Sequence, residues 1–383
     1  MKNIYRSLLL LAITMATVVF YTSCKKDNDL PNNGEPRISY IRVTDPVSGD
    51  SLLAAAAQGM LIAIVGENLQ DAKEIWFNDL MASLTPTYVT STTILVSVPS
   101  KIPTVVDNKL KINFSNGKTL EYFFPVKIGE PIITRMDCEY VPDGGVATIS
   151  GNYFYEPLTV TFPGGGVAEI VSVEDEMVKV TVPAGALPGQ ITVKTNFGEV
   201  ASDFWFRDNR NIFISSDPFS GWWGSGFVVS NPGPEDPATI NGNYIRVKDA
   251  ISGWQWKEVV GGPADAMGAI SKNIPDEAIL KPENFNLKFE LNTKKPFNAN
   301  VIKLCVGVDN DSHGDYLWNP PYDTKGVWQT VIIPFEEVAA AYNSKLTVSP
   351  TGYYARVLFH GGGDLNCDMS FDNFRVVPKV IKK

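Results

Sequence analysis

Apolar and polar residues alternate in short runs along most of this chain, and Gly, Pro and Asn separate the runs. Alternation over roughly four to eight residues is typical of half-buried β-strands, whose successive side chains point to opposite faces. The turn residues between the runs favour short strands with tight connections. The pattern therefore predicts an all-β protein.

The region beyond residue 208 has enough runs for a sandwich of its own. They cover residues 211–214, 227–229, 244–247, 285–291, 301–308, 328–333, 355–359 and 369–377, and only residues 336–342 look helical. Eight strands in one domain favour a jelly-roll-like β-sandwich. Residues 209–383 are therefore predicted to form one domain.

The region before this domain contains a weak internal repeat. Residues 34–38 recur at 129–133, and residues 66–69 recur at 151–154, each between two apolar runs. Units of roughly 80 to 95 residues built from short alternating strands are what an immunoglobulin-like sandwich requires. The repeat predicts two tandem Ig-like domains, at residues 36–129 and 130–208. In these domains Trp76, Trp205 and Phe206 are expected in the core, because they lie in periodic strands.

The N-terminal segment predicts export. A positive start and an apolar stretch at residues 7–20, too short to span a bilayer, are typical of a signal peptide. Residues 21–24 then resemble a bacterial lipoprotein processing site, with Cys24 as the lipidated residue. The charged residues 25–29 resemble the tag that sends Bacteroidetes lipoproteins to the outer face of the outer membrane. We expect a signal peptide at residues 1–23, a tether at 24–35, and a lipid-anchored protein exposed on the cell surface.

Charge and cysteine content restrict the kinds of ligand and metal that the chain is expected to bind. The formal net charge of −9 disfavours nucleic acid and anionic lipid, so a neutral ligand suits the chain better. After Cys24, only Cys138, Cys305 and Cys367 remain, widely spaced and without a C-x-x-C pair, which indicates neither a zinc site nor a disulfide framework. Cys305 and Cys367 could pair, although buried free thiols are favoured. No cofactor is expected.

Tryptophan is concentrated in the last domain. Six of the eight tryptophans lie beyond residue 208, most of them in polar segments flanked by Gly or Pro. A pyranose ring presents a face of polarised C–H bonds to an indole, while polar side chains bind its hydroxyls. This concentration of indoles predicts sugar binding.

Six aromatic residues are candidates for the glycan site. Trp254 and Trp256 would project from one face if residues 253–259 form a strand, and Trp256 is preferred. Trp318 is expected to point outward, because the prolines that follow it forbid a central strand, and Tyr322 is a weaker candidate. Of the adjacent Trp222 and Trp223, one should point outward, and which one stays open. Trp328 begins a periodic strand and is assigned to the core.

Polar candidates follow the same loops. Residues 309–315 match the first half of a calcium loop, but Pro320 stands where the bidentate Glu belongs, so no metal is expected. We assign Asp309, His313 and Asp315 instead as turn residues or as hydroxyl partners of a sugar at Trp318, and Arg356 and His360 could line the same edge. Neither histidine lies near a Ser or Cys motif that would indicate a catalytic triad.

Several motifs carry a family resemblance. The order of strands in the two repeats resembles the IPT/TIG group of Ig-like domains, and residues 326–335 (G-x-W-Q-T-V-x-I-P-F) and 371–376 resemble strands of carbohydrate-binding sandwiches. With the lipoprotein signal, the chain resembles the B-type surface glycan-binding proteins of Bacteroidetes polysaccharide-utilisation loci, whose last domain belongs to the xyloglucan-binding-domain family. The resemblance implies capture of a polysaccharide, such as xyloglucan, mixed-linkage β-glucan or β-mannan, and delivery to an outer-membrane transporter.

Two other functions stay open. A surface adhesion lipoprotein that binds protein would also use Ig-like domains and exposed indoles. A glycoside hydrolase would need two carboxylates about 5–10 Å apart, and Asp265, Glu258 and Asp364 are available, but none lies in a recognised motif. We therefore expect a binding protein and no enzyme.

Overall fold

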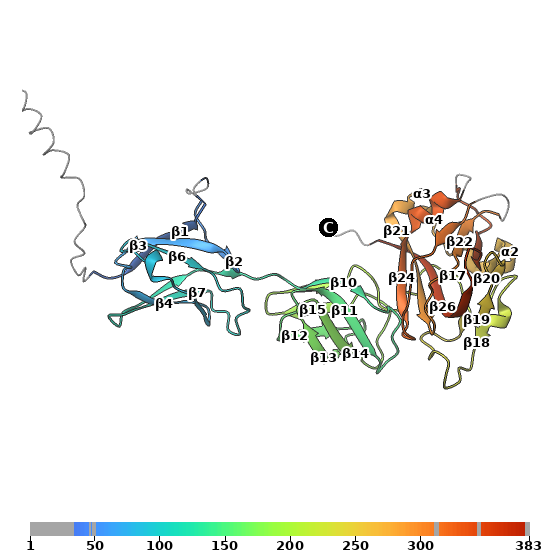
Figure 1. The fold of residues 1–383 in the computed structure, drawn as a ribbon, viewed down its shortest axis with the longest axis horizontal. Coiled ribbons are helices and arrows are strands. Elements are labelled where there is room, and N and C mark those ends of the chain that lie inside the picture. Colours follow the sequence, from blue (N-terminus) through green and yellow to red (C-terminus); the bar gives the residue numbers. More distant parts are fainter. Residues whose placement is uncertain (1–33, 46, 48–50, 310–313, 343–345, 380–383) are drawn as a thin grey trace, which may run out of the picture. The chain divides into compact units, whose positions relative to one another are not determined.

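The computed structural model describes residues 34–45, 47, 51–309, 314–342 and 346–379 (Figure 1). The expected signal peptide, Cys24 and His313 lie outside the described residues. Strands joined by short turns make up nearly all the regular structure, which confirms the all-β prediction. No helix in the described ranges has both the length and the apolar character needed to cross a membrane.

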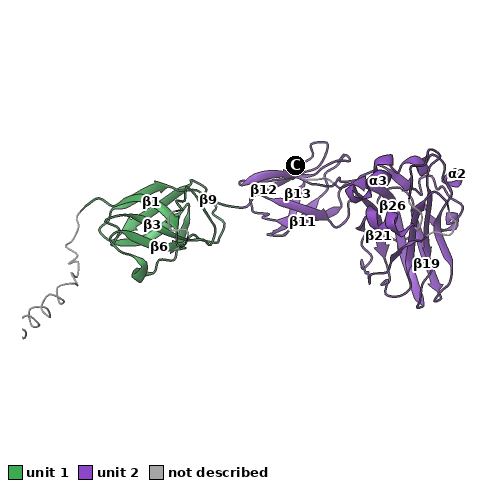
Figure 2. Cartoon of the chain, turned by 90° about the horizontal axis from the view of Figure 1, so that it is seen from above, with its two compact units in different colours: residues 1–128 green, residues 129–383 purple. Residues whose placement is uncertain are grey.

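The chain divides into two compact units, residues 1–128 and 129–383 (Figure 2). In the first unit, two sheets with the orders β1-β3-β6 and β5-β4-β7-β8 form the first sandwich, and a short parallel pair joins β2 to β9. Its strands are β1 Arg37–Val43, β2 Ala56–Ala57, β3 Leu61–Glu67, β4 Ala72–Phe77, β5 Leu80–Ala82, β6 Thr93–Ser97, β7 Lys109–Phe114, β8 Thr119–Phe123 and β9 Val126–Lys127.

The second unit begins with a second sandwich of similar design. Its sheets have the orders β10-β11-β14-β13 and β12-β15-β16. The strands are β10 Ile132–Met136, β11 Val146–Asn152, β12 Leu158–Thr161, β13 Glu169–Glu174, β14 Met177–Thr181, β15 Thr192–Thr195 and β16 Gly198–Ala201. In β11 and β14 buried residues alternate with partly exposed ones, which is the period-two pattern that the sequence shows.

The rest of the second unit is a C-terminal sandwich of two larger sheets. The six-stranded sheet has the order β18-β19-β26-β21-β24, with β17 paired to β26, and the four-stranded sheet has the order β20-β25-β22-β23. The strands are β17 Ile212–Ile214, β18 Val228–Val229, β19 Tyr244–Ile251, β20 Lys257–Gly262, β21 Phe285–Thr293, β22 Ile302–Gly307, β23 Tyr316–Trp318, β24 Gln329–Pro334, β25 Tyr354–Phe359 and β26 Leu365–Pro378.

In the described part of the chain the α-helices are short and lie in the C-terminal sandwich, while a 3-10 turn at Pro86–Tyr88 belongs to the first sandwich. The expected helix is present as α4 Phe335–Ala341, and Figure 1 shows α3 and α4 at one end of this sandwich. The expectation of a single helix was wrong, because α2 Ala264–Met267 and α3 Asp276–Leu280 also form. Each has one or two turns behind a proline, too few for an amphipathic period to appear in the sequence.

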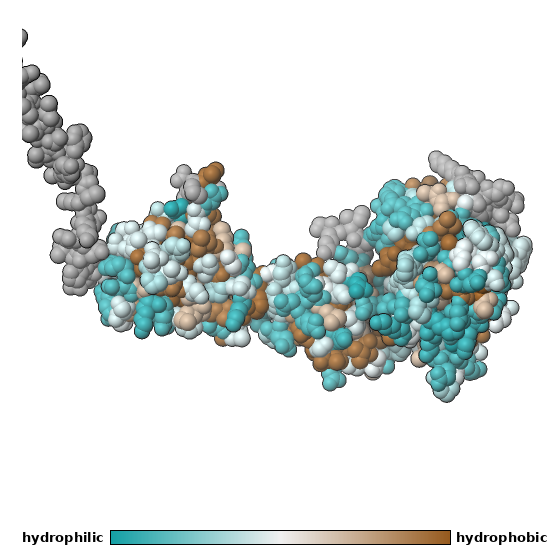
Figure 3. Space-filling view, in the orientation of Figure 1, coloured by the Kyte–Doolittle hydropathy of each residue, from teal (hydrophilic) through white to brown (hydrophobic). Residues whose placement is uncertain are grey.

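Each sandwich has its own hydrophobic cluster. The cluster of the second sandwich also includes Tyr244 and Trp328 of the C-terminal sandwich, so these two parts of the second unit pack on each other. Trp328 is buried and donates its indole N–H to the Ala238 carbonyl at 2.8 Å, which confirms its assignment to the interior. Cys138, Cys305 and Cys367 are buried, and no disulfide joins them in the described part of the chain. On the face shown in Figure 3, hydrophobic residues form small patches among hydrophilic ones.

The expected core roles of Trp76 and Trp205 were wrong. Trp76 lies on the outer face of β4, where it lines a hollow of about 370 Å³ with polar residues of β7 and β8. Trp205 is partly exposed and stacks under the guanidinium of Arg210, 3.7 Å from the ring centroid. Both indoles alternate with core residues, Ile75 or Phe77 and Phe204 or Phe206, so the period was correct and the face was misassigned.

Candidate functional site

The outer face of the four-stranded sheet carries the candidate site. In β25, Ala355, Val357 and Phe359 belong to the main hydrophobic cluster, and Arg356 alternates with them. Because successive strand residues point to opposite faces, Arg356 faces away from the core, as does His360 just beyond the strand. On this outer face Arg356 lies between the buried Tyr354 and Leu358, so the face is partly packed and partly polar.

Two exposed indoles lie at the edge of this outer face. Trp254 is 68% exposed and Trp256 is 52% exposed. Their rings contact His360, with ring centroids 5.7 Å from Trp254 and 5.0 Å from Trp256. The structure therefore brings together three of the residues proposed from the sequence, although from segments about 100 residues apart.

The strand expected at residues 253–259 was wrong in its first half, because β20 begins only at Lys257. Trp254 has a left-handed backbone (φ 64°) in a turn closed by the Gln255 N–H on the Ser252 carbonyl. The Trp254 N–H donates to the Gly361 carbonyl at 2.6 Å, and the Gly253 N–H donates to the Asp364 carboxylate at 2.8 Å. The turn, rather than a strand, holds Trp254 against the 361–364 loop.

An ion pair lies beside Trp256 on the sheet. Arg356 bonds both carboxylate oxygens of Asp315, at 2.8 and 3.1 Å, and both side chains are about nine-tenths buried. The guanidinium carbon lies 5.2 Å from the centroid of the Trp256 ring, within cation–π range. The ring N–H of Trp256 donates to Glu258 at 2.7 Å. Trp256 is thus held at its face and at its edge, which fixes its plane for a ligand.

Buried polar atoms without a hydrogen-bond partner in the described chain lie beside these indoles. Among the described residues, Glu258 Oε2, Arg356 Nε and His360 Nδ1 have no hydrogen-bond partner. Burial raises the pKa of Glu258, against the lowering effect of the Trp256 hydrogen bond and of Arg356. Partial burial and the nearby Lys303 ammonium lower the pKa of His360. These three atoms are enclosed, so what the site exposes to a ligand is mainly the two indole rings.

Trp222 and Trp223 lie at the other end of β20. Trp222 is 60% exposed, and its N–H donates to the Gly261 carbonyl at 2.8 Å. Trp223 is partly buried against the small cluster of Cys305, Tyr342 and Tyr354. The two rings meet edge to face with centroids 5.7 Å apart. The structure answers the question that the sequence left open: Trp222 is the exposed indole of the pair.

We call the exposed indoles Trp222, Trp254 and Trp256, with Glu258, Asp315, Arg356 and His360, the aromatic platform. From residue 256 to residue 261 the chain spans about 16 Å at the usual rise of a strand, which is longer than one sugar ring. The platform is therefore an open surface suited to a chain rather than a closed pocket for a single small molecule.

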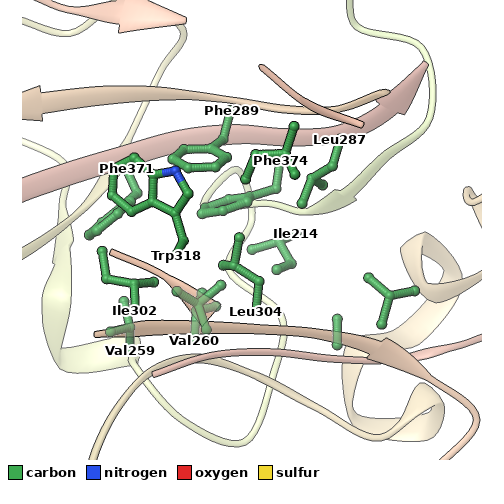
Figure 4. Close-up of a cluster of buried hydrophobic side chains, with 14 of the residues drawn as sticks. Ile214, Val259, Val260, Leu287, Phe289, Ile302, Leu304, Trp318, Phe371 and Phe374 are labelled. Carbon is green, nitrogen blue, oxygen red and sulfur yellow. The ribbon is translucent and has the colours of Figure 1, made fainter. Parts of the chain in front are cut away.

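The expected outward position of Trp318 was wrong. Trp318 is 5% exposed and belongs to the main hydrophobic cluster (Figure 4). It is the last residue of β23 and pairs with Ile302, and its ring stacks in parallel on Phe297 with centroids 5.4 Å apart. The prolines that follow end the strand after Trp318, so they do not turn its side chain out.

Tyr322 does not reach the platform either. Its ring packs on Trp318 with centroids 5.5 Å apart, and its hydroxyl donates to Gln329 of β24, in the six-stranded sheet. A backbone bridge to Phe297 holds it there. Both aromatic residues of this loop therefore stabilise the domain interior.

Two residues at or beside the platform were not predicted from the sequence as glycan-binding residues. Glu258 was considered only as a hydrolase carboxylate, and Lys303, whose ammonium lies 6.0 Å from the Trp256 ring centroid, was not considered. Lys303 pairs with Leu358 of β25 across the sheet. The alternation of β22 could have placed Lys303 on an outer face, but nothing in the sequence gives the order of strands that brings it to Trp256.

Comparisons with known proteins agree on the nature of the C-terminal domain. Residues 206–378 match the family model of the surface glycan-binding protein B xyloglucan binding domain. Over an alignment of 500 residues the chain is 32% identical to an IPT/TIG domain-containing protein of Bacteroides ovatus, covering 99% of this chain and 100% of the relative.

Solved structures give the same picture of the fold. A surface glycan-binding protein of Prevotella bryantii matches with a TM-score of 0.66 and 23% identity, over 90% of this chain and 99% of that one. A second match is a B-type surface glycan-binding protein from a complex xyloglucan utilisation locus in Bacteroides uniformis, with a TM-score of 0.48 and 18% identity over 90% and 100% of the two chains. The first of these matches shows a shared fold.

Proposed function

This chain belongs to the B-type surface glycan-binding proteins, and on that premise we propose that its aromatic platform binds a β-linked polysaccharide with a glucan or mannan backbone. The observation that carries the proposal is the position of Trp256. Its exposed ring is held by the Arg356 guanidinium, 5.2 Å from the ring centroid, and by the hydrogen bond from its N–H to Glu258. A ring held in this way can stack on the face of a sugar.

The open shape of the platform supports a chain-like ligand. Each stacked ring contributes on the order of 1 kcal/mol, so two or three stacked rings with a few hydrogen bonds give an affinity in the micromolar range. The net charge of −9 favours a neutral glycan over an acidic one. Xyloglucan and mixed-linkage β-glucan are our first candidates, followed by β-mannan.

Capture without cleavage is part of the proposal. Hydrolysis needs one free carboxylate as acid and another as base or nucleophile. At the platform Asp315 is held by Arg356, and Asp364, beside the Trp254 turn, accepts the Gly253 N–H at 2.8 Å, so Glu258 is the carboxylate there with a buried oxygen that has no partner among the described residues. The family members matched here are also glycan-binding proteins.

We further propose that Cys24 carries a lipid anchor and that the protein is exposed on the outer face of the outer membrane. The signal-like segment before Cys24 and the charged residues after it support this placement. In this position the protein raises the local concentration of glycan for an outer-membrane transporter. Globomycin-sensitive processing and protease accessibility on intact cells, compared with a Cys24→Ala variant, test the anchor separately from glycan binding.

Affinity electrophoresis and calorimetry test the ligand. The mature chain is compared with Trp256→Ala and Trp254→Ala on xyloglucan, mixed-linkage β-glucan, β-mannan and no glycan. We expect binding to one of these glycans, a loss of tenfold or more for Trp256→Ala, and a smaller loss for Trp254→Ala. Trp76→Ala, which removes an indole from the other unit, is the matched control and should bind normally.

Two outcomes would change the proposal. Binding that survives both platform substitutions would place the glycan elsewhere on the chain. Absence of binding to every glycan, together with adhesion to protein that excess oligosaccharide does not reduce, would favour the adhesion function. Release of reducing sugar that Glu258→Gln abolishes would contradict the non-catalytic part.

A further inference from the structure

A second site lies on the other sheet of the C-terminal sandwich. A hollow of about 430 Å³ opens where β17 and the 241–243 turn meet the middle of β26. Its lining is mostly polar and comprises Ile212, Ile214, Ser215, Asp217, Asn241, Gly242, Asp372 and Asn373. None of the platform residues contributes to it, so it is separate from the proposed glycan site.

Asp372 is the unusual member of this lining. The residue is 5% exposed, and its Oδ1 accepts the Asn373 backbone N–H at 2.9 Å. Its Oδ2 is buried and has no hydrogen-bond partner among the described residues. A buried carboxylate oxygen without a partner is strongly unfavourable, because burial removes its hydration and nothing replaces it. The oxygen therefore indicates a ligand that the hollow admits.

The side-chain amide of the next residue, Asn373, also has a buried polar atom without a hydrogen-bond partner in the described chain. Asn373 is buried, its Oδ1 accepts a hydrogen bond from the Asn241 amide, and its Nδ2 has no partner in the described chain. A half turn of both amides exchanges donor and acceptor in this bond and directs Asn373 Oδ1 into the hollow. Asn373 can therefore present an oxygen beside Asp372 while keeping its bond to Asn241.

A second carboxylate, that of Asp217, also lines the hollow. Asp217 accepts the Asn243 N–H with both oxygens, at 2.9 and 3.0 Å, and the charges of Asp217 and Asp372 interact. No Lys or Arg lines the hollow. The charge of Arg375 acts to lower the pKa of Asp372, but this guanidinium is bonded to Glu139 and Glu290. Among the described residues, neither Asp372 nor Asp217 therefore has a cation as a direct partner.

We propose that this hollow binds a divalent cation of the calcium class, held by Asp372 and Asp217 with the amide oxygen of Asn373. No group of three or more His, Cys, Asp or Glu side chains placed to hold a metal occurs in the described part of the chain, so amide oxygens and water must complete the shell. Calcium accepts this mixture, because it takes about six to eight oxygen ligands in flexible geometry, whereas zinc prefers nitrogen and sulfur. The size of the hollow leaves room for several waters.

Thermal unfolding and calorimetry of the full mature chain test the proposal. After treatment with chelator, the protein is titrated with calcium chloride, and magnesium chloride serves as the comparison ion. We expect one saturable calcium site with weaker magnesium binding, and a melting temperature about 3–6 °C higher when calcium is tenfold above its Kd. Chelator should reverse the shift.

Substitutions at the hollow decide whether this site causes the calcium response. Asp372→Asn keeps the shape and removes the buried charge, so it should fold at least as well in chelator and lose the calcium response. Asp217→Asn should weaken calcium binding tenfold or more while keeping an acceptor for Asn243. Glu283→Gln, an exposed carboxylate elsewhere in the domain, is the control and should respond as the wild type does.

Three results would overturn the proposal. One is no heat and no melting shift with calcium, which would mean that the hollow holds water only. Another is an equal calcium response in Asp372→Asn and the wild type, which would place the ion elsewhere. The third is magnesium binding as tight as calcium binding. Glycan affinity is measured in parallel and should not change in Asp372→Asn.

Discussion

The two sheets of the C-terminal sandwich have outer faces of opposite character. The four-stranded sheet exposes indoles, with Trp254 and Trp256 in solvent. The six-stranded sheet buries charges: Arg375 and Glu290 are completely enclosed, and Glu139 of the second sandwich reaches them. Each face thus inverts the usual rule that apolar groups are buried and charged groups exposed.

The contents of the buried face explain the inversion. Arg375 bonds Glu139 at 2.7 Å and Glu290 at 2.9 Å, and Lys288 bonds Glu139 at 2.6 Å. Thr330 completes the contact, because its backbone N–H donates to the Asp137 carbonyl and its side chain accepts the Glu139 N–H. The network joins the second sandwich to the C-terminal sandwich. One outer face is therefore used inside the molecule, and the other is left for a ligand.

Breaking the buried network should have the largest effect. Arg375→Leu leaves Glu139 and Glu290 buried without their common partner, which should lower the free energy of unfolding of the second unit by about 3–5 kcal/mol. Urea unfolding followed by tryptophan fluorescence measures this loss. Arg375→Lys, which keeps the charge but not the two-pronged geometry, should fall between the variant and the wild type. A loss below about 1 kcal/mol for Arg375→Leu would mean that the network does not hold the two sandwiches together.

Removing Trp318 tests whether this indole belongs to the interior between the two sheets or to the exposed face. Trp318→Ala should destabilise the protein by about 3 kcal/mol, because a large ring that stacks on Phe297 is replaced by a cavity. Under conditions in which the variant stays folded, glycan affinity should equal that of the wild type. Trp318→Phe keeps most of the volume and should lose less stability. A selective loss of glycan binding in the Phe variant would return Trp318 to the site.

Breaking the ion pair on the exposed face should have a moderate effect. Asp315→Asn removes the charge that holds Arg356 beside Trp256, so glycan affinity should fall roughly three- to tenfold, or about 1 kcal/mol. Calorimetry on the preferred glycan measures the change. Asp249→Asn breaks the more exposed pair with Lys257 and is the control, with an expected change of less than twofold. Equal losses in the two variants would mean that the pair has no special role.

The smallest effect concerns pH. Burial raises the pKa of Glu258, so the folded chain binds this proton more strongly than the unfolded chain does. The contribution of Glu258 to stability is therefore fully present below its ordinary pKa and is lost as pH rises through the raised value. Glu258→Gln should gain stability relative to the wild type as pH increases across this window. Parallel stability curves from pH 4 to pH 7 would contradict this assignment.

The fold was largely readable from the sequence because strand alternation reports local geometry. Period-two patterns gave the strands of β11, β21 and β26, and the helical pattern gave α4. The patterns do not say which face of a strand is covered by another part of the chain. For this reason the outward face of Trp76 and the inward face of Trp318 were both misassigned, and the burial of Glu290 could not be foreseen.

The candidate site was predictable in composition but not in assembly. Residue type and flanking turns identified Trp254, Trp256, Arg356 and His360. Tryptophans flanked by glycine are more typical of loops than of buried strands. Their association depends on β20 lying beside β25, which is a long-range pairing. Whether they bind glycan is still a prediction.

The charged joint at Glu139 also limits how these chains can be rebuilt by recombination. If an Ig-like domain from another protein replaced the second sandwich, it would have to supply a carboxylate opposite Arg375 and Lys288. Otherwise both cations would be buried without the partner that Glu139 provides. We therefore expect the two sandwiches from residue 129 onward to keep their fold only when they are transferred together. An exchange of spacer domains that keeps these two sandwiches together should be made at the boundary between residues 128 and 129.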